Sequence, residues 1–241
     1  MHALYRYFPK TKKELVEIIK AEVEKKGWNC SLNSIDTSKI TDMSFLFSND
    51  PYSGYELGEF NGDISRWNVS NVTTTRGMFK GAESFNQPIG NWDVSKVVDM
   101  CGMFARAISF NQPIGDWNVS NVTNMEHTFF WTESFNQPIG DWNVSNVTTM
   151  RGMFYLAESF NQPIGDWDVS NVTDMQSMFY DADSFNQDLS KWKHKTNCNT
   201  YKIFYKCPIK EEYMPNGIWI SKGVYESNMK LLTDLGNSEL D

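Results

Sequence analysis

The sequence predicts an α/β solenoid: one elongated domain of stacked 25-residue coils, each with a short strand and a short helix, and with a cap at either end. Three observations predict this fold. A long motif recurs at a fixed step, the apolar residues inside it follow first one spacing and then another, and the motif decays towards both ends of the chain. The alternative is a plain β-solenoid without helices.

Tryptophan marks the fixed step most clearly. The tryptophans that lie 25 residues apart are Trp67, Trp92, Trp117, Trp142, Trp167 and Trp192. Columns of phenylalanine, aliphatic residues and valine keep the same step within the motif SFNQPIGDWNVSNV. A period shared by several columns indicates units that stack, because one coil of this size cannot enclose its own apolar side chains.

Each unit contains two apolar spacings. Residues 89–100 have the LxxLxLxx spacing of a leucine-rich repeat, so we expect a short strand at Trp92 and Val94 with both side chains pointing inward. Residues 97–107 have apolar residues at helical spacing, which predicts a short helix that returns the chain along the other side. The Asn-Gln-Pro-Ile-Gly segment is then the turn into the next strand.

An asparagine recurs at the start of that turn. Its copies are Asn86, Asn111, Asn136, Asn161 and Asn186. Stacked coils place these amides in register, so we expect a ladder that satisfies backbone groups of the turns, a structural role rather than contact with a ligand.

The ends of the chain lack the motif and are expected to cap the stack. Residues 1–34 form the N-terminal cap, with a helix near residues 12–26 that begins at a capping box of Thr11 and Glu14 and stops at Gly27. Residues 35–207 form the array, whose first coil has a seven-residue insertion and whose last coil is degenerate. Residues 208–241 are a second cap or tail.

Charge excludes one class of partner. The chain has a net charge of −8, and residues 63–187 hold six Lys/Arg against fourteen Asp/Glu, so we expect no nucleic-acid binding by the repeats. No secretory leader or membrane-spanning apolar run is evident, which predicts no membrane insertion and a cytoplasmic location by default.

The sequence offers little catalytic chemistry. Its three histidines have no Ser, Cys or carboxylate partner at a recurring spacing, and its four cysteines form no CxxC or Cys/His ligand set. We therefore expect a protein that is not an enzyme and uses no metal or cofactor. Cys198 and Cys207 remain candidates for a disulfide in an oxidising compartment.

The string at residues 153–175, MFYLAESFNQPIGDWDVSNVTDM, resembles the repeats of BspA-like leucine-rich-repeat surface proteins, a family also known from mycoplasma lipoprotein-associated repeats of unknown function. The resemblance extends from about Ile35 to Cys207. It implies a non-catalytic array for protein binding or adhesion, often displayed on bacterial surfaces, which makes the cell surface or secretion the alternative location. The family has no defined ligand residues that could be transferred.

Two surfaces are candidate binding sites for a protein or a glycan, and we expect protein interaction or adhesion to occur through the first of them. The first is a polar, mildly acidic strand face whose residues flank the tryptophans: Asn91, Asp93, Asp116, Asn118, Asp141, Asn143, Asp166 and Asp168. The second lies on the most divergent coil, at His127, Phe130 and Trp131. The alternative function is a structural array without a specific macromolecular partner, in which Asp116, Asp141 and Asp166 could bridge cations.

Overall fold

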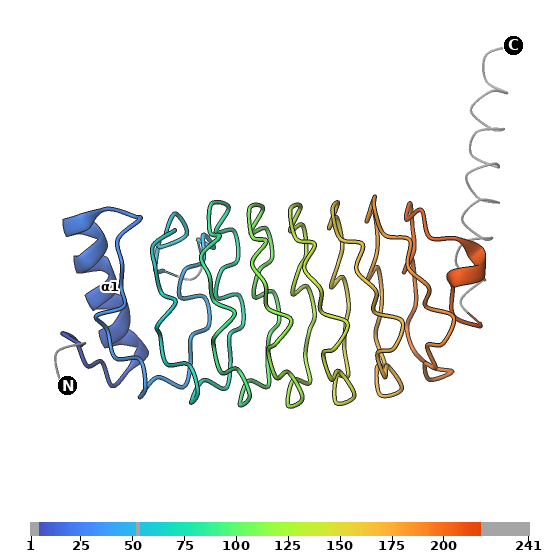
Figure 1. Ribbon diagram of the computed structural model, residues 1–241, viewed down its shortest axis with the longest axis horizontal. Coiled ribbons are helices and arrows are strands. Elements are labelled where there is room, and N and C mark those ends of the chain that lie inside the picture. Colours follow the sequence, from blue (N-terminus) through green and yellow to red (C-terminus); the bar gives the residue numbers. More distant parts are fainter. Residues whose placement is uncertain (1–4, 52–53, 218–241) are drawn as a thin grey trace, which may run out of the picture.

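The computed structural model describes residues 5–51 and 54–217. The chain winds into one row of stacked coils, with helix α1 at the N-terminal end and the short 3-10 helix η1 (Glu211–Tyr213) at the other (Figure 1). The predicted solenoid of 25-residue units is therefore confirmed. Of the predicted C-terminal segment, residues 218–241 lie outside the described part of the chain.

Helix α1 (Lys12–Lys26) occupies the residues that the capping pattern predicts. The Thr11 hydroxyl accepts a hydrogen bond from the Glu14 amide at 3.2 Å, and Gly27 ends the helix with a φ of 84°. The Glu14 carboxylate accepts from the amide of Lys10, one residue before the expected partner. The apolar face of α1, with Leu15 and Ile19 fully buried, covers the open end of the core.

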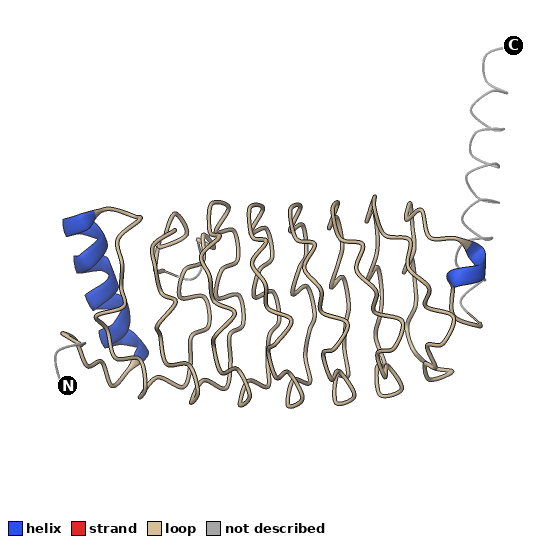
Figure 2. Cartoon of the chain, viewed as in Figure 1, coloured by secondary structure: helices blue, strands red, loops and turns tan. Residues whose placement is uncertain are grey.

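The predicted helix within each coil is wrong. In the described residues α1 is the only α-helix, and the segment that follows each Met is a pair of β-turns (Figure 2). Met103 donates to the carbonyl of Met100, and Ala107 donates to that of Phe104. The third residue of each turn has positive φ, 61° at Gly102 and 60° at Arg106, as type II turns require.

Two consecutive turns give the same sequence pattern as a helix, because paired turns and a helix each place an apolar residue on the inner side every three or four positions. The hydrogen bonds separate the two structures. Gly102 and Phe104 donate their amides to carbonyls of the next coil, at 2.8 and 2.9 Å, whereas an α-helix would use these groups within itself. The turns thus join neighbouring coils, which a helix could not do.

The predicted strand at the tryptophans is also wrong. Trp92 donates its amide to Ile89 and Val97 donates to Val94, so this part of the coil consists of turns. Parallel pairing between coils is confined to single-residue bridges, which link Asp42, Thr74, Asp99, Asn124, Thr149, Asp174 and Asn199 in succession. The coils therefore hold neither the strand nor the helix of an α/β unit.

Aromatic rings stacked from coil to coil form the core. The rings of Phe79, Phe104, Phe129, Phe154, Phe179 and Phe204 have adjacent centroids 5.5 to 5.7 Å apart. Trp117 stacks on Trp92 at 6.5 Å, and its indole N–H donates to the carbonyl of Ile89 at 3.2 Å. Because each ring packs on its own copy, an insertion inside a core segment would break the stack.

The predicted asparagine ladder is confirmed. Asn86 Oδ1 accepts the backbone amide of Asn111 at 3.0 Å and the side-chain amide of Gln112 at 3.0 Å. The same arrangement repeats through the array, and at its end Asn186 Oδ1 accepts the amide of Lys210, also at 3.0 Å. The ladder satisfies turn amides that the irregular backbone would otherwise leave unpaired.

Candidate functional site

The eight residues predicted to form the strand face are all exposed, and we call the surface they line the acidic face. The four residues that follow a tryptophan accept hydrogen bonds from their own coil. Asp93 Oδ1 accepts the amide of Ser95 at 3.1 Å and Asp168 Oδ1 that of Ser170 at 3.0 Å, while Asn118 and Asn143 make the same contact. These hydrogen bonds lower the pKa of Asp93 and of Asp168 and explain why the column is always Asp or Asn in these coils.

The residues that precede the tryptophans, Asn91, Asp116, Asp141 and Asp166, form the other half of the acidic face. Asp166 pairs with Lys191 of the next coil at 2.7 Å, but both side chains are so exposed that the pair contributes little. Within the described residues, no group of three His, Cys, Asp or Glu side chains is arranged to hold a metal ion. The acidic face has no aromatic side chain among these eight residues.

The surface of the paired turns differs from the acidic face because it carries aromatic side chains. We call it the turn face, and it consists of residues 76–81, 101–106, 126–131, 151–156, 176–181 and 201–206. A row of stacked, half-buried aromatic rings lies on it, formed by Phe130, Tyr155, Tyr180 and Tyr205. Adjacent centroids are 4.8, 4.5 and 4.4 Å apart. Burial and the neighbouring tyrosines raise the pKa of Tyr180 to about 12.

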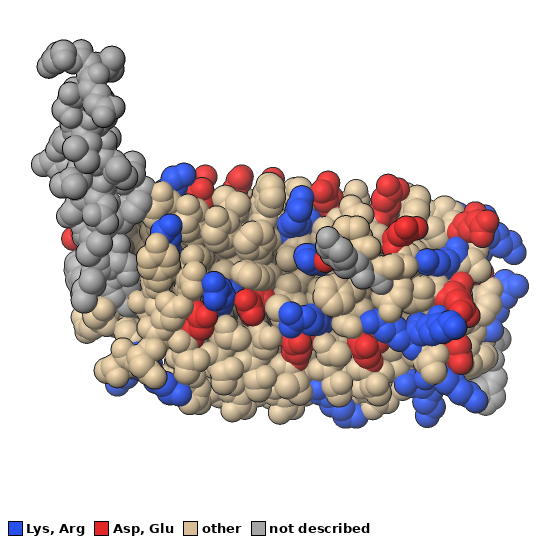
Figure 3. All heavy atoms as spheres, turned by 180° about the vertical axis from the view of Figure 1, so that it is seen from behind, with Lys and Arg blue, Asp and Glu red and all other residues tan. Residues whose placement is uncertain are grey.

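Ion pairs also cross the turn face from coil to coil. Arg76 lies 3.5 Å from Asp99, and Arg151 lies 3.6 Å from Asp174. Figure 3 shows Lys and Arg next to Asp and Glu along one side of the solenoid. The turn face therefore combines aromatic and charged groups, whereas the acidic face offers carboxylates and amides alone.

The structure brings the three predicted residues of the divergent coil together on the turn face. The ring of His127 meets that of Phe130 edge to face, with centroids 5.2 Å apart. Trp131 donates its indole N–H to Glu133 at 2.8 Å, and the Arg106 guanidinium lies over its ring at 5.0 Å. Burial, helped by Arg151 and Lys80, lowers the pKa of His127, so this imidazole is neutral at pH 7.

A recess of about 250 Å³ lies beside His127 and Phe130. It spans four consecutive coils and is lined by Phe45, Arg76, Gly77, Lys80, Cys101, Gly102, Ala105, Arg106, His127 and Phe130. The lining residues of the three preceding coils were not predicted from the sequence, because this segment was expected to form a helix. The available signal was the pair of glycines, Gly77 and Gly102, which occupy one column in consecutive coils.

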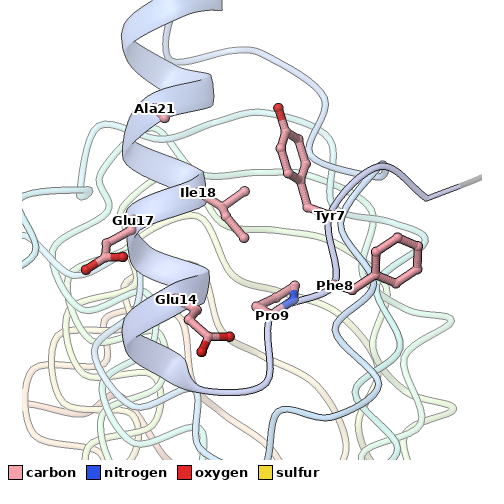
Figure 4. Close-up of a pocket in the computed structure, with 7 residues that line it drawn as sticks. All are labelled: Tyr7, Phe8, Pro9, Glu14, Glu17, Ile18 and Ala21. Carbon is pink, nitrogen blue, oxygen red and sulfur yellow. The ribbon is translucent and has the colours of Figure 1, made fainter.

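A second hollow lies at the N-terminal cap, between α1 and residues 7–9 (Figure 4). Ile18 points into it from the helix, and Phe8, with 62% of its surface exposed, also lines it. The Tyr7 hydroxyl donates to the buried carboxylate of Glu22 at 2.6 Å, which fixes the segment against α1. Two carboxylates, those of Glu14 and Glu17, line the hollow together with its apolar side chains.

The cysteines form no disulfide in the described part of the chain. Cys198 and Cys207, the candidates for a disulfide, are both present as thiols. The Cys207 thiol donates to the carbonyl of Phe185 at 3.4 Å, and Cys198 is half-buried. Burial raises the pKa of Cys101 and of Cys198 to about 11, which leaves both as unreactive thiols at neutral pH.

The repeats match the model of a known protein family. A family model described as a mycoplasma protein of unknown function, DUF285, matches the chain twice, over residues 17–130 and 112–215. The chain belongs to this family. No curated protein and no solved structure matches it. None of the helices in residues 5–51 and 54–217 is long and apolar enough to span a bilayer.

Proposed function

We propose that this member of the family is a non-catalytic repeat scaffold that binds a protein partner through its turn face. The observation that carries the proposal is where the coils differ from one another. Six tryptophans and five asparagines are repeated without change, and the structure assigns each column to stacking or to the ladder. The turn face needs no such uniformity.

The columns of the turn face vary in size and charge. One column reads Arg76, Cys101, Glu126, Arg151, Gln176 and Tyr201. Another reads Gly81, Arg106, Trp131, Leu156, Asp181 and Lys206. Stacking tolerates this variation, because the backbone hydrogen bonds between turns are the same whatever the side chain. A surface that differs from coil to coil can encode a specific contact, which the uniform acidic face cannot.

The residue types on the turn face favour a protein over a glycan. Tyr, Trp and Arg carry a large share of binding energy at protein interfaces, and all three lie here. Sugar rings stack on exposed aromatic faces. The rings of Tyr155 and Tyr180 instead cover each other at 4.5 Å and present their edges and hydroxyls.

The resemblance to BspA-like surface proteins extends the proposal to adhesion at a cell surface. The chain would then be related to these proteins through a shared leucine-rich-repeat architecture. The chain would then meet its partner outside the cell; a cytoplasmic location with an intracellular protein partner is the alternative. Immunolabelling of intact and permeabilised cells of the source organism separates the two locations.

An affinity experiment with three forms of the full chain tests the proposed face. The wild type is compared with a turn-face variant, Tyr155→Ser with Tyr180→Ser, and an acidic-face variant, Asp116→Lys with Asp141→Lys and Asp166→Lys. We expect one partner to be retained by the wild type and the acidic-face variant and lost by the turn-face variant. Thermal unfolding of each form shows that the variants remain folded.

Two outcomes contradict the proposal. Loss of the partner by the acidic-face variant alone would move the site to that surface. Absence of any specifically retained protein, together with a calcium-dependent rise in melting temperature that the acidic-face variant lacks, would favour the alternative function, a structural array whose Asp column bridges cations.

A further inference from the structure

The recess on the turn face exists because of which residues share one column. The first turn of each coil has a residue with positive φ, and the rings of Phe45 and His127 at this position lie over the glycine of the next coil. A Cβ built on Gly77 would lie 2.4 Å from the Phe45 ring, and one built on Gly152 would lie 2.4 Å from the ring of His127. Phe45 and His127 therefore cover the glycines that follow them.

Gly102 is the exception. The preceding residue of its column, Gly77, has no side chain to cover it, and a Cβ on Gly102 would meet only Ala105, at 3.8 Å. Two glycines in succession thus leave a gap between Phe45 and His127, which both glycines line without a side chain. Other members of the column, such as Ser177 and Lys202, have side chains at a positive φ of 55°, so the backbone itself does not require glycine at this place.

Three cationic side chains, Arg76, Lys80 and Arg106, line the recess. Arg76 and Lys80 are held by carboxylates of other coils, Asp99 at 3.5 Å and Asp50 at 2.7 Å. Arg106 differs, since no carboxylate of the described residues lies within 4.0 Å of it. Its exposed guanidinium rests on the ring of Trp131, which keeps the charge at the edge of the recess.

We propose that the recess binds an acidic peptide segment of a protein partner: an aromatic or large aliphatic side chain inserts between Phe45 and His127, and an adjacent carboxylate pairs with Arg106. This assignment rests on the proposed function and names the chemistry of its partner. Apolar walls with few polar groups at the rim are typical of a pocket that accepts one anchoring side chain. The guanidinium supplies two parallel donors for a carboxylate.

The shape of the surface favours a peptide segment over a free small molecule. The volume of about 250 Å³ lies below the range of ordinary small-molecule sites, about 300–1,000 Å³. The recess ends at Phe130, where the aromatic row with Tyr155 and Tyr180 begins. A segment anchored in the recess can therefore continue along this row and gain further contacts.

A displayed library of random linear peptides, selected on the full chain, tests the assignment without knowledge of the natural partner. Gly102→His is used for counter-selection, because the new side chain starts in the recess at a φ of 61°, close to the 55° of His127. The new ring precedes His127, which unlike Gly77 and Gly152 carries a Cβ, so thermal unfolding must show that the variant stays folded. Ser177→His is the matched control: the same residue type in the same column, at a φ of 55°, outside the recess lining.

We expect the enriched peptides to share an aromatic or large aliphatic residue within two positions of Asp or Glu. One such peptide, labelled for fluorescence anisotropy, should bind the wild type and Ser177→His equally, and Gly102→His about tenfold more weakly. Arg106→Gln, which leaves the recess open, should weaken binding about fivefold and reduce its dependence on salt.

The assignment is overturned if the library yields no sequences that distinguish the wild type from Gly102→His, or if the enriched sequences are basic or lack acidic residues. It is also overturned if binding is the same in Arg106→Gln as in the wild type. These results are independent of the affinity experiment with the tyrosine variants: a partner lost with the tyrosines but kept by Gly102→His would leave the turn face as the binding surface and remove the recess from it.

Discussion

The side-chain oxygen Oδ1 of Asn136 accepts the backbone N–H of Asn161, 3.0 Å away in the next coil. It also accepts the side-chain amide of Gln162 at 2.8 Å. One amide group thus satisfies two donors of a neighbouring turn, and the repetition of this contact along the array replaces the hydrogen-bond ladder that a continuous strand would provide.

Asn136→Ala is expected to lower the free energy of unfolding by about 2 kcal/mol, because it leaves the amide of Asn161 without an acceptor in a partly buried turn. Chemical denaturation measures this loss. Asn143→Ala is the control, since the Asn143 carboxamide accepts only from the exposed Ser145 and its loss should cost less than about 1 kcal/mol. Equal costs for the two variants would contradict the structural role of the ladder.

Thr75→Met is expected to stabilise the protein by about 1–2 kcal/mol. The Thr75 hydroxyl is buried without a hydrogen-bond partner, in a column where the next coil carries Met100. The matched control is Thr128→Met, because the Thr128 hydroxyl donates to backbone carbonyls, at 3.2 Å to Met100 and 3.0 Å to Met125. Thermal unfolding should rank Thr75→Met above the wild type and Thr128→Met; the reverse order would refute the explanation.

Gly152→Ala is expected to destabilise the protein by about 2–4 kcal/mol, of which about 1–2 kcal/mol comes from the positive φ and the rest from the clash with His127. In a His127→Ala background only the backbone part should remain, so the same substitution should cost about half as much. A double-mutant cycle in urea measures the coupling. A coupling of zero would show that the two residues do not touch.

Stability should also depend on the protonation of His127. Because burial lowers its pKa in the folded protein below the ordinary 6.5, the unfolded chain binds more protons at acidic pH. The contribution of His127 to the free energy of unfolding is therefore highest above about pH 6.5, where the imidazole is neutral, and it falls as the pH drops towards the pKa of His127 in the folded protein. The difference in unfolding free energy between the wild type and His127→Gln, measured from pH 5 to 7.5, should shrink or reverse on acidification. A constant difference would contradict the lowered pKa.

The stack, the period and the N-terminal cap could all be read from the amino-acid sequence. The tryptophan column, the asparagine column and the capping pattern at Thr11 each depend on contacts that recur at a fixed step or lie within one helix, so they can be read along the chain. The exposure of the acidic face was also predictable, because residues that alternate with Trp and Val point away from a buried pair.

How each coil is built, and where its surface is hollow, depends on contacts between coils that no single stretch of sequence contains. Paired turns and a short helix place Met, Phe and Ala on the inside at the same spacing, and the choice between them depends on whether Gly102 and Phe104 bond within their coil or to the next one. That choice is made by stacking. The recess follows from it, because Phe45, Gly77, Gly102 and His127 become neighbours only when turns of successive coils lie in register.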